Sequence, residues 1–418
     1  MGVVPLRQVP GETWMLELDQ ALPWDFKKDG SLRPTSLLNA ALMIEHHPEL
    51  ERAFVYDNFR DLITVTKPLG QLDTRRAPRA LSDNDEMELA LWLNVHGVTV
   101  AVPSVAAIIR RVAFKQGTDR LRDFISPLEW DGKERITNWL TTYAGVEETP
   151  ATRLIGRKFL ISAIARALKP GCKVDTMLIL EGPQGIRKSS LARELCGPEW
   201  FADQLGDIRS KDSSQLIQGN WIIEVPEMDK LNRHEANAVK EYVSRQRDIY
   251  RPPYGRNVVN RARRCVFIGT INPNGVGYIK DSTGGRRFWP VRCTDIDLEL
   301  VQRDRTQLWA EALAAYRAGD HWWLNEEEAR ILEPEQASRI DDDLWDDRVA
   351  SFLESDGHKG VTSSSVLYDA LGIKVSEQDQ RMKNRISDIL TRFGYENRVE
   401  RMDDGSGKRK PARVWRKA

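Results

Sequence analysis

The strongest local signal for a fold in this sequence is Met177-Leu178-Ile179-Leu180-Glu181-Gly182-Pro183-Gln184-Gly185-Ile186-Arg187-Lys188-Ser189-Ser190. It opens with four apolar residues, a run too short for a helix and of the right length for a buried strand. A glycine-rich turn follows, and residues 191–195 then favour a helix. Strand, glycine-rich turn and helix in this order predict a loop whose backbone N–H groups surround phosphate.

Two further apolar runs have the same strand-like length. They cover residues 221–225 and 265–270, and stretches of helical periodicity separate the runs from one another. Uninterrupted apolar strands alternating with helices predict a parallel sheet that is covered on both faces. The predicted fold class is therefore α/β, with a P-loop NTPase core over residues 151–324.

The glycine-rich turn matches most of the Walker A pattern of ATP-binding loops. Lys188 would neutralise phosphate charge and the Ser189 hydroxyl would ligate Mg²⁺, so ATP and Mg²⁺ are the predicted ligands. Arg187 departs from the pattern, which has a glycine there, and its side chain would either obstruct the loop or point outward. The alternative is an ordinary helix N-terminal turn with a surface lysine. The predicted ATP-binding residues are Gly182, Pro183, Gln184, Gly185, Ile186, Arg187, Lys188, Ser189 and Ser190.

Polar residues follow the second and third apolar runs. Parallel strands deliver their carboxyl ends to one edge of a sheet, where ligands bind. We assign Glu224 to the metal together with Ser189, and Glu227 to the attacking water as the catalytic base. Asn272 would orient that water against the γ-phosphate. The alternatives are solvated surface carboxylates and an asparagine that caps the next turn.

Arginines form two groups beside these motifs. Arg286 and Arg287 follow two glycines, and they could reach developing phosphate charge or a DNA backbone. In a ring of copies, one of them could act on a neighbour's site. Arg251 and Arg256 alternate with tyrosines, a composition that suits single-stranded nucleic acid. A surface network of ion pairs is the alternative for this second group.

The C-terminal part is basic after an acidic stretch. Residues 325–347 are interpreted as an acidic linker, and residues 348–418 as a winged-helix-like DNA-binding domain with two helices and a hairpin. From residue 380 to the end there are twelve Lys or Arg residues against five Asp or Glu residues. A solvated tail is the alternative. The predicted DNA contacts of the chain are Arg251, Arg256, Arg381, Lys383, Arg385, Lys408, Arg409, Lys410 and Arg413.

The N-terminal part carries no motif with chemistry. Residues 1–75 are predicted to be an accessory region and residues 76–150 a mainly helical region, joined by an arginine-rich linker at 74–85. The 418 residues are 41% hydrophobic and 30% charged, which is usual for a globular protein. No apolar run has the roughly 18–20 residues that cross a bilayer, and four scattered cysteines fit a reducing cytoplasm.

A series of short motifs runs in order through residues 130–325. They are Trp130-Asp131-Gly132, Glu181-Gly182-Pro183-Gln184-Gly185, Lys211-Asp212, Trp221-Ile222-Ile223-Glu224, Ser244-Arg245, Tyr250-Arg251-Pro252-Pro253-Tyr254-Gly255-Arg256, Gly269-Thr270-Ile271-Asn272 and Thr283-Gly284-Gly285-Arg286-Arg287-Phe288-Trp289-Pro290. With these motifs, residues 130–325 resemble the virulence-associated protein E family of phage and prophage replication proteins, which is related to superfamily 3 helicases. This resemblance implies an AAA+ or superfamily 3-like ATPase, a homo-oligomeric ring around DNA, and site roles for Lys188, Ser189, Glu224, Glu227 and Asn272.

Three functions compete on this evidence. The leading hypothesis is an ATP-dependent DNA helicase or helicase-like replication protein of a phage or mobile element, acting on single-stranded or origin DNA, with host or phage replication proteins as further partners and no membrane. The second is a nucleotide-binding, hydrolysis-poor initiator or regulator that binds DNA. The third, a small-molecule kinase, leaves the basic C-terminal part and the paired arginines without a role.

Overall fold

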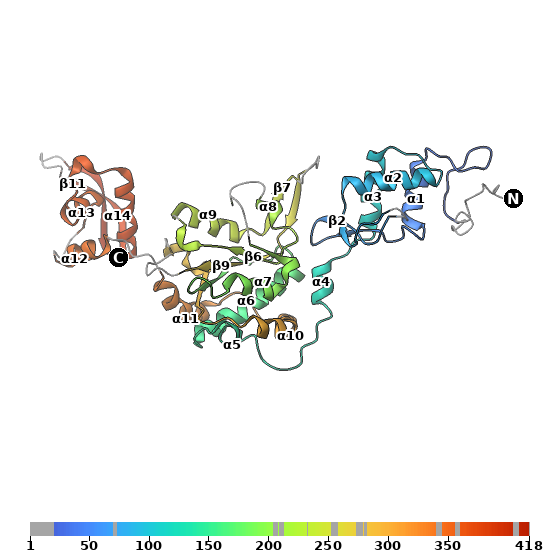
Figure 1. Ribbon diagram of the computed structural model, residues 1–418. Coiled ribbons are helices and arrows are strands. Elements are labelled where there is room, and N and C mark those ends of the chain that lie inside the picture. Colours follow the sequence, from blue (N-terminus) through green and yellow to red (C-terminus); the bar gives the residue numbers. More distant parts are fainter. Residues whose placement is uncertain are drawn as a thin grey trace.

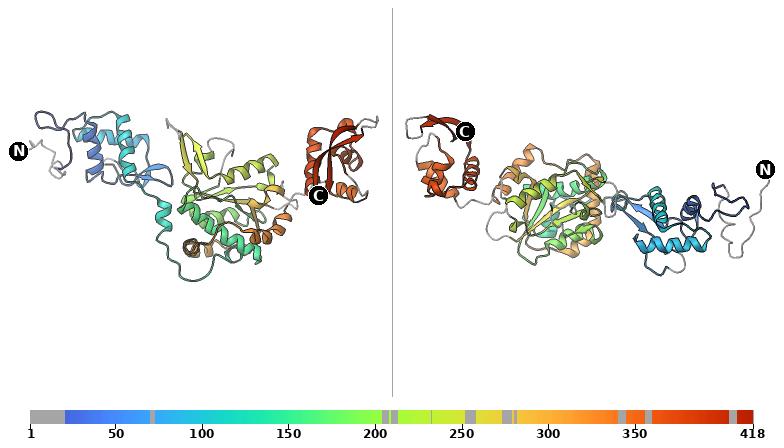
Figure 2. Two further views of the ribbon diagram at one scale, coloured as in Figure 1. Left: turned by 180° about the vertical axis from the view of Figure 1, so that it is seen from behind. Right: turned by 90° about the horizontal axis from the view of Figure 1, so that it is seen from above.

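Three bodies follow one another along the chain (Figure 1). The computed structural model describes residues 21–69, 73–203, 208, 213–231, 233–251, 258–272, 279, 282–339, 345–355, 360–403 and 409–417. An N-terminal module lies at one end, a central α/β body in the middle and a C-terminal module at the other end, and two further views show the same order (Figure 2). Among the described residues no helix is both long and apolar enough to cross a membrane.

The N-terminal module, residues 21–118, packs around one apolar cluster. Buried side chains from residue 40 to residue 113 form this cluster, so it spans the predicted boundary at residue 75. The predicted linker at 74–85 is wrong, because Arg79 pairs there with the buried carboxylates of Asp73 and Asp85. Its elements are α1 (Leu37–His46), β1 (Phe54–Asp57), β2 (Leu62–Val65), β3 (Arg79–Ala80), α2 (Asp83–Val95) and α3 (Val102–Lys115), and the strands form an antiparallel sheet in the order β1-β2-β3.

The central body is built on a parallel sheet of five strands, which confirms the predicted α/β class. In the order of the sheet the strands are β10 (Phe288–Arg292), β4 (Met177–Glu181), β9 (Val266–Ile271), β6 (Ile222–Val225) and β5 (Phe201–Ala202). The sequence predicted β4, β6 and β9 but not the other two. β5 has only two residues. β10 contains Pro290, which has no backbone N–H to donate, and such a residue is tolerated in an edge strand.

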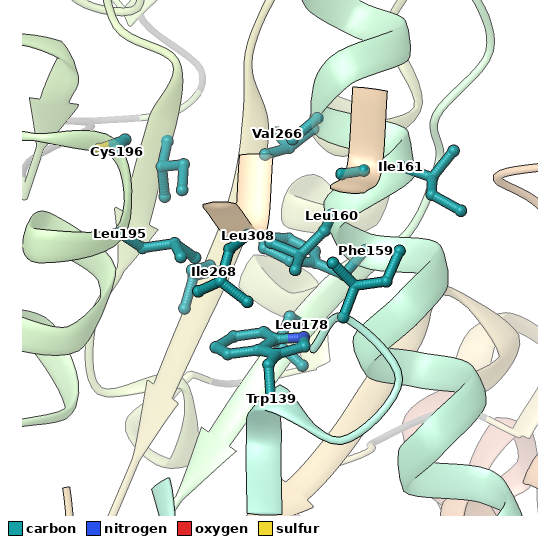
Figure 3. Close-up of a cluster of buried hydrophobic side chains, with 14 of the residues drawn as sticks. Trp139, Phe159, Leu160, Ile161, Leu178, Leu195, Cys196, Val266, Ile268 and Leu308 are labelled. Carbon is teal, nitrogen blue, oxygen red and sulfur yellow. The ribbon is translucent and has the colours of Figure 1, made fainter. Parts of the chain in front are cut away.

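Helices cover both faces of this sheet. One face packs against α6 (Pro150–Leu168), α7 (Lys188–Cys196) and α10 (Leu298–Arg317), and the other against α9 (Arg233–Ser244). Figure 3 shows the first face, where Trp139, Phe159 and Leu178 are among the buried side chains. The strands alternate their side chains between these two apolar layers, which holds their carboxyl ends at one edge.

Further elements complete the central body. They are α4 (Arg120–Ile125), α5 (Trp139–Ala144), η2 (Pro198–Trp200), α8 (Ser213–Leu216), η3 (Met228–Lys230), η4 (Ser282–Arg287), the hairpin of β7 (Arg247–Tyr250) and β8 (Val259–Ala262), and α11 (Glu326–Ala337).

Helix α11 corrects the first half of the acidic linker predicted over residues 325–347, while residues 340–344 of that linker lie outside the described residues. Asn325 caps the helix and accepts from the backbone N–H of Glu328, whose side chain accepts in return. The acidic residues therefore occupy the first turn of a helix, where the helix dipole favours negative charge. Leu332 is fully buried in the core cluster of the sheet, so α11 belongs to the central body.

The C-terminal module has the helices and the hairpin that the sequence predicted, preceded by one more helix. Its elements are α12 (Asp346–Ser355), α13 (Ser363–Asp369), η5 (Val375–Glu377), α14 (Gln380–Arg392), β11 (Tyr395–Asp403) and β12 (Arg409–Lys417). Val361 and Trp415 exchange two backbone hydrogen bonds, which fastens the hairpin to the segment before α13. The assignment of this module as a winged helix stays a prediction.

Candidate functional site

A cavity of about 290 Å³ lies at the carboxyl edge of the central sheet. Strands β4 and β9 are neighbours, and the chain leaves β4 toward β5 at one side of the sheet but leaves β9 toward β10 at the other, so a topological switch point lies between β4 and β9. Ligands of open α/β sheets bind in the crevice at such a switch point. The cavity is lined by Gln184, Gly185, Arg187, Lys188, Ser189, Glu224, Pro226, Glu227, Thr270 and Asn272.

The loop between β4 and α7 has backbone angles that favour glycine. A Cβ on Gly182 would lie 2.5 Å from Ile186 Cδ1 and 2.8 Å from the Cys293 carbonyl oxygen, so no larger residue fits there. Arg187, the residue before α7, has a φ of 71°, a left-handed angle that costs a non-glycine residue roughly 1–2 kcal/mol. The Arg187 side chain is exposed and lines the cavity, so the loop does not bury this side chain.

Lys188 is the buried positive charge of the cavity. Its Nζ donates to the Gly182 carbonyl oxygen at 2.6 Å, the Pro183 carbonyl oxygen at 2.8 Å and Asn272 Oδ1 at 2.9 Å. An ammonium group has three donors, and these three acceptors occupy them. Burial lowers the pKa of Lys188 below its usual value, because a low-dielectric environment disfavours the charged form. Phosphate oxygens would therefore compete with neutral acceptors for this group.

A hydroxyl–carboxylate–hydroxyl cluster lies on the α7 side of the sheet. Ser189 Oγ and Thr270 Oγ1 each donate to Glu224 Oε1 at 2.7 Å, and Glu224 is only 2% exposed. Hydroxyl and carboxylate oxygens are ligands that Mg²⁺ accepts, with water and phosphate oxygens completing the shell. No group of three or more His, Cys, Asp or Glu residues suited to a metal exists among the described residues. The oxygen cluster therefore fits a magnesium ion that a phosphate also holds.

Glu227 differs from Glu224 in its surroundings. Its backbone has a φ of 50°, and its carboxylate, 57% exposed, forms an ion pair with Lys230 at 2.6 Å. Glu227 nevertheless lines the cavity, so the two acids that the sequence singled out lie on the same site. One is buried in the hydroxyl cluster and the other is solvated at the rim.

The structure adds two residues that the sequence prediction missed. The position of Thr270 is explained by the alternation of side chains along a strand. Thr270 lies two residues after Ile268, which is paired with Glu224, so Thr270 and Glu224 face the same side of the sheet. Asp229, in η3, carries a buried Oδ1 that has no hydrogen-bond partner in the described part of the chain. The Asp229 carboxylate lies close enough to raise the pKa of Lys188 in opposition to burial. No sequence pattern marks it apart from other loop aspartates.

Arg286 and Arg287 lie at the opposite edge of the sheet from the cavity. They end η4 and directly precede β10, whose first residue pairs in parallel register with the first residue of β4. The length of β10, about 3.3 Å for each residue, therefore separates them from the loop of their own chain. Arg287 Nε donates to Ser244 Oγ of α9 at 2.9 Å, and Arg286 is exposed.

The predicted DNA contacts lie on the β7–β8 hairpin and the C-terminal module. Arg251, Arg381 and Arg413 are exposed, and Lys383 is half-buried. The Arg385 guanidinium lies 4.0 Å from the centre of the Trp345 ring, so this arginine packs within its own module. Arg409 and Lys410 belong to β12, and Arg256 and Lys408 lie outside the described residues.

The family model of the virulence-associated protein E-like domain matches residues 125–341. The chain belongs to the virulence-associated protein E-like family. The match covers just over half of the chain, including the glycine-rich loop between β4 and α7, both strand-end acids and the paired arginines, and it confirms the family resemblance found in the sequence. Helix α11 also falls inside the matched region.

Comparisons with solved structures and with curated proteins were made as well. The chain is similar to two structures of the NrS-1 C-terminal region, with sequence identities of 12% and 13% and TM-scores of 0.43 and 0.45. Each alignment covers 86% of this chain and 95% of the other. A likeness this distant assigns neither an activity nor a partner. The comparison with curated proteins found no match.

Proposed function

We propose that this protein is a Mg²⁺-dependent P-loop ATPase that acts on DNA, as a helicase or helicase-like replication protein of a phage or mobile element. One observation carries the proposal: a single cavity brings together Lys188, the Ser189–Glu224–Thr270 cluster and Asn272 at the amino end of α7. These are the groups that triphosphate binding and in-line phosphoryl transfer require.

The loop and α7 would hold the triphosphate. Backbone N–H groups at the start of α7 have no partners within the helix, and the helix dipole makes this end positive. Lys188 would exchange the Gly182 and Pro183 carbonyl oxygens for phosphate oxygens, while its bond to Asn272 fixes its direction. Glu224 and Ser189 would hold Mg²⁺, which neutralises charge on the phosphates when it is bound.

Glu227 is the proposed base for the attacking water. It lines the cavity but lies outside the hydroxyl cluster, so its carboxylate is not occupied by Ser189 or Thr270. Its partner Lys230 is 64% exposed and screened by solvent, which makes this ion pair easy to exchange for water. Asn272 would orient the same water from the end of β9.

DNA contacts are proposed for two exposed surfaces. The outward face of the β7–β8 hairpin carries Arg251 beside Ile249, which is 67% exposed, and Val258, which is 58% exposed. Arg381 of α14 and Arg413 of β12 are exposed on the C-terminal module. Arginines beside apolar side chains suit single-stranded nucleic acid, because the arginines can neutralise its phosphate charges while the apolar side chains contact its bases.

A ring of copies is the proposed assembly. The exposed Arg286 lies too far from the phosphate loop of its own chain, so it would contact the triphosphate of a neighbouring copy. The AAA+ or superfamily 3-like relationship implied by the sequence supports this arrangement.

ATP hydrolysis measured with and without single-stranded DNA tests the proposal. The wild type should hydrolyse Mg-ATP faster when DNA is added, and Lys188→Ala should abolish both rates. Lys169→Ala removes an exposed lysine of the same body and should leave both rates unchanged. Hydrolysis that ignores DNA would refute the coupling, and hydrolysis that survives Lys188→Ala would refute the site.

The second candidate is a nucleotide-binding but hydrolysis-poor initiator or regulator. The exposed, lysine-paired Glu227 and the arginine in the phosphate loop favour it, because both depart from an efficient hydrolytic site. It predicts specific duplex binding that survives Glu227→Gln and is lost when residues 380–417 are removed. Duplex binding that persists after this truncation would exclude it.

A further inference from the structure

The N-terminal module contacts the central body through the turn between β1 and β2. Arg60 Nη2 donates to the Glu199 carbonyl oxygen at 3.1 Å, and the Arg264 guanidinium lies 4.9 Å from the centre of the Phe59 ring. A Cβ on Gly219 would lie 2.8 Å from Arg60 Cγ, so the two bodies are in close packing there. This turn lies beside the base of the β7–β8 hairpin, which rises from the central body on the side of the N-terminal module (Figure 1).

Asp61 is the centre of the contact with the hairpin. From the central body its carboxylate accepts Tyr250 OH at 3.0 Å and Arg261 Nε at 3.0 Å, and Arg261 Nη2 also donates to it. Tyr56 OH of the N-terminal module donates to the same carboxylate. The Asp61 side chain is 13% exposed, so solvent screens these bonds little. Burial, followed by the Asp61 charge, raises the pKa of Tyr250, which keeps its hydroxyl a donor at neutral pH.

The hairpin depends on contacts of this kind, because two strands alone are marginally stable in water. At the base, Asp248 forms a fully buried ion pair with Arg263, which also donates to the Tyr242 carbonyl oxygen. Tyr250 is the last residue of β7 and lies directly before Arg251. The Asp61 contact therefore supports the strand close to the exposed arginine, while the buried ion pair holds the strand nearer its start.

We propose that the N-terminal module positions the β7–β8 hairpin through Asp61, so that presentation of the hairpin's outward face to nucleic acid depends on this contact. The module thereby gains a role that its sequence, which has no chemical motif, does not indicate. The part of the proposal that concerns nucleic acid rests on the proposed function. The part that concerns hairpin position does not, since it follows from the contacts of Asp61 alone.

Amide hydrogen exchange of the full chain tests the position of the hairpin. Asp61→Asn removes the charge yet suits a left-handed backbone, since asparagine tolerates the Asp61 φ of 56°. It should speed exchange across residues 247–251 and 258–262 by about 10-fold or more, since bonds to a charged acceptor are strong. Exchange in α1 and α3 should not change. Glu51→Gln, an exposed acid of the same module, is the matched control and should leave the hairpin unchanged.

Tyr250→Phe supplies an independent variant that removes one hydroxyl and leaves the N-terminal module intact. It should speed exchange of the hairpin by less than Asp61→Asn, and the double variant should add little to Asp61→Asn, since both act on one contact. Equal exchange in wild type and Asp61→Asn, or fully additive effects, would overturn the proposal.

Binding of a fluorescent oligo-dT strand completes the test. Asp61→Asn should weaken binding several-fold, while basal ATP hydrolysis without DNA stays at the wild-type rate. Faster hairpin exchange with unchanged DNA binding would overturn the link between hairpin position and nucleic acid. If the wild type bound no DNA, the proposed function would fail, and hydrogen exchange would still decide whether Asp61 holds the hairpin.

Discussion

The two edges of the central sheet hold their charged side chains in opposite ways. At the carboxyl edge, Lys188 is buried and donates to the loop after β4 and to Asn272, and Glu224 is buried and accepts from Ser189 of α7 and Thr270 of β9. At the amino edge, Arg286 is exposed and Arg287 donates to Ser244 of α9. Buried charges persist only where hydrogen-bond partners compensate for the loss of hydration. The positions of Lys188 and Glu224 at the carboxyl edge are therefore fixed by their partners.

The difference indicates that each edge has its own task. The carboxyl edge has oxygen ligands and a lysine that would suit a magnesium–phosphate site, and among the described residues that line its cavity Arg187 is the one arginine. The amino edge presents the exposed Arg286. In a ring of copies the amino edge of one chain would face the cavity of the next and complete it.

Replacement of Arg286 is expected to have the largest effect on ATP hydrolysis. Arg286→Ala should lower ATP hydrolysis by about 10³-fold or more, the contribution of an arginine supplied to a phosphoryl-transfer site. Mixing it with Lys188→Ala should restore part of the activity, because mixed rings contain sites with both an intact lysine and an intact arginine. Arg330→Ala, an exposed arginine of α11, is the control. Lack of any recovery on mixing would show that Arg286 does not act across copies.

Glu224→Gln tests the buried acid of the carboxyl edge. It should lower hydrolysis by on the order of 10²–10³-fold, because Mg²⁺ supplies several kcal/mol at such a site and loses its charged ligand. Thr270→Val removes one hydrogen bond to the same carboxylate and should cost about 10-fold. Rates that rise again at high Mg²⁺ would support the assignment, and wild-type rates in both variants would exclude Glu224 as a metal ligand.

Glu227→Gln tests whether Glu227 has a different role from Glu224. Hydrolysis should fall by about 10²-fold with little change in Mg-ATP affinity, as expected when a general base is lost but binding is kept. Lys230→Ala, which frees the Glu227 carboxylate, should not lower the rate. Single-turnover rates together with equilibrium binding separate the two quantities, and a parallel loss of affinity would argue that Glu227 binds rather than activates.

The smallest expected effect concerns Arg187. Arg187→Gly relieves the left-handed backbone and should stabilise the protein without nucleotide by up to about 1 kcal/mol, with hydrolysis changed less than about 10-fold. Thermal unfolding monitored by circular dichroism gives the stability. A loss of hydrolysis beyond 10-fold would show that this arginine has a role in the reaction.

The sequence was sufficient for the elements with strong local signals. The runs that became β4, β6 and β9 are mainly apolar, and parallel pairing brings Lys188, Glu224 and Asn272 to one edge without further information. The direction of Glu227 was not predictable, because its solvated ion pair with Lys230 depends on a backbone angle that no pattern encodes.

Other features depend on tertiary contacts that local patterns do not carry. Glutamates 326–328 have the composition of a linker, yet Leu332 buries in the core and makes the segment a helix of the central body. Asp61 gave no signal in the sequence, since its partners Tyr250 and Arg261 lie about two hundred residues away. The sequence also suggested that Arg286 could reach phosphate charge, whereas the parallel register of β10 with β4 places Arg286 at the opposite edge of the sheet from the loop of its own chain.

Calorimetric titration of the full chain with ATP and Mg²⁺ at millimolar concentration measures whether the cavity beside Lys188 binds a triphosphate. The cavity beside Lys188 predicts saturable binding, at one nucleotide for each chain, that Lys188→Ala abolishes and Lys169→Ala leaves intact. Absence of binding in the wild type, or equal binding in Lys188→Ala, would contradict a triphosphate site at the carboxyl edge of the sheet.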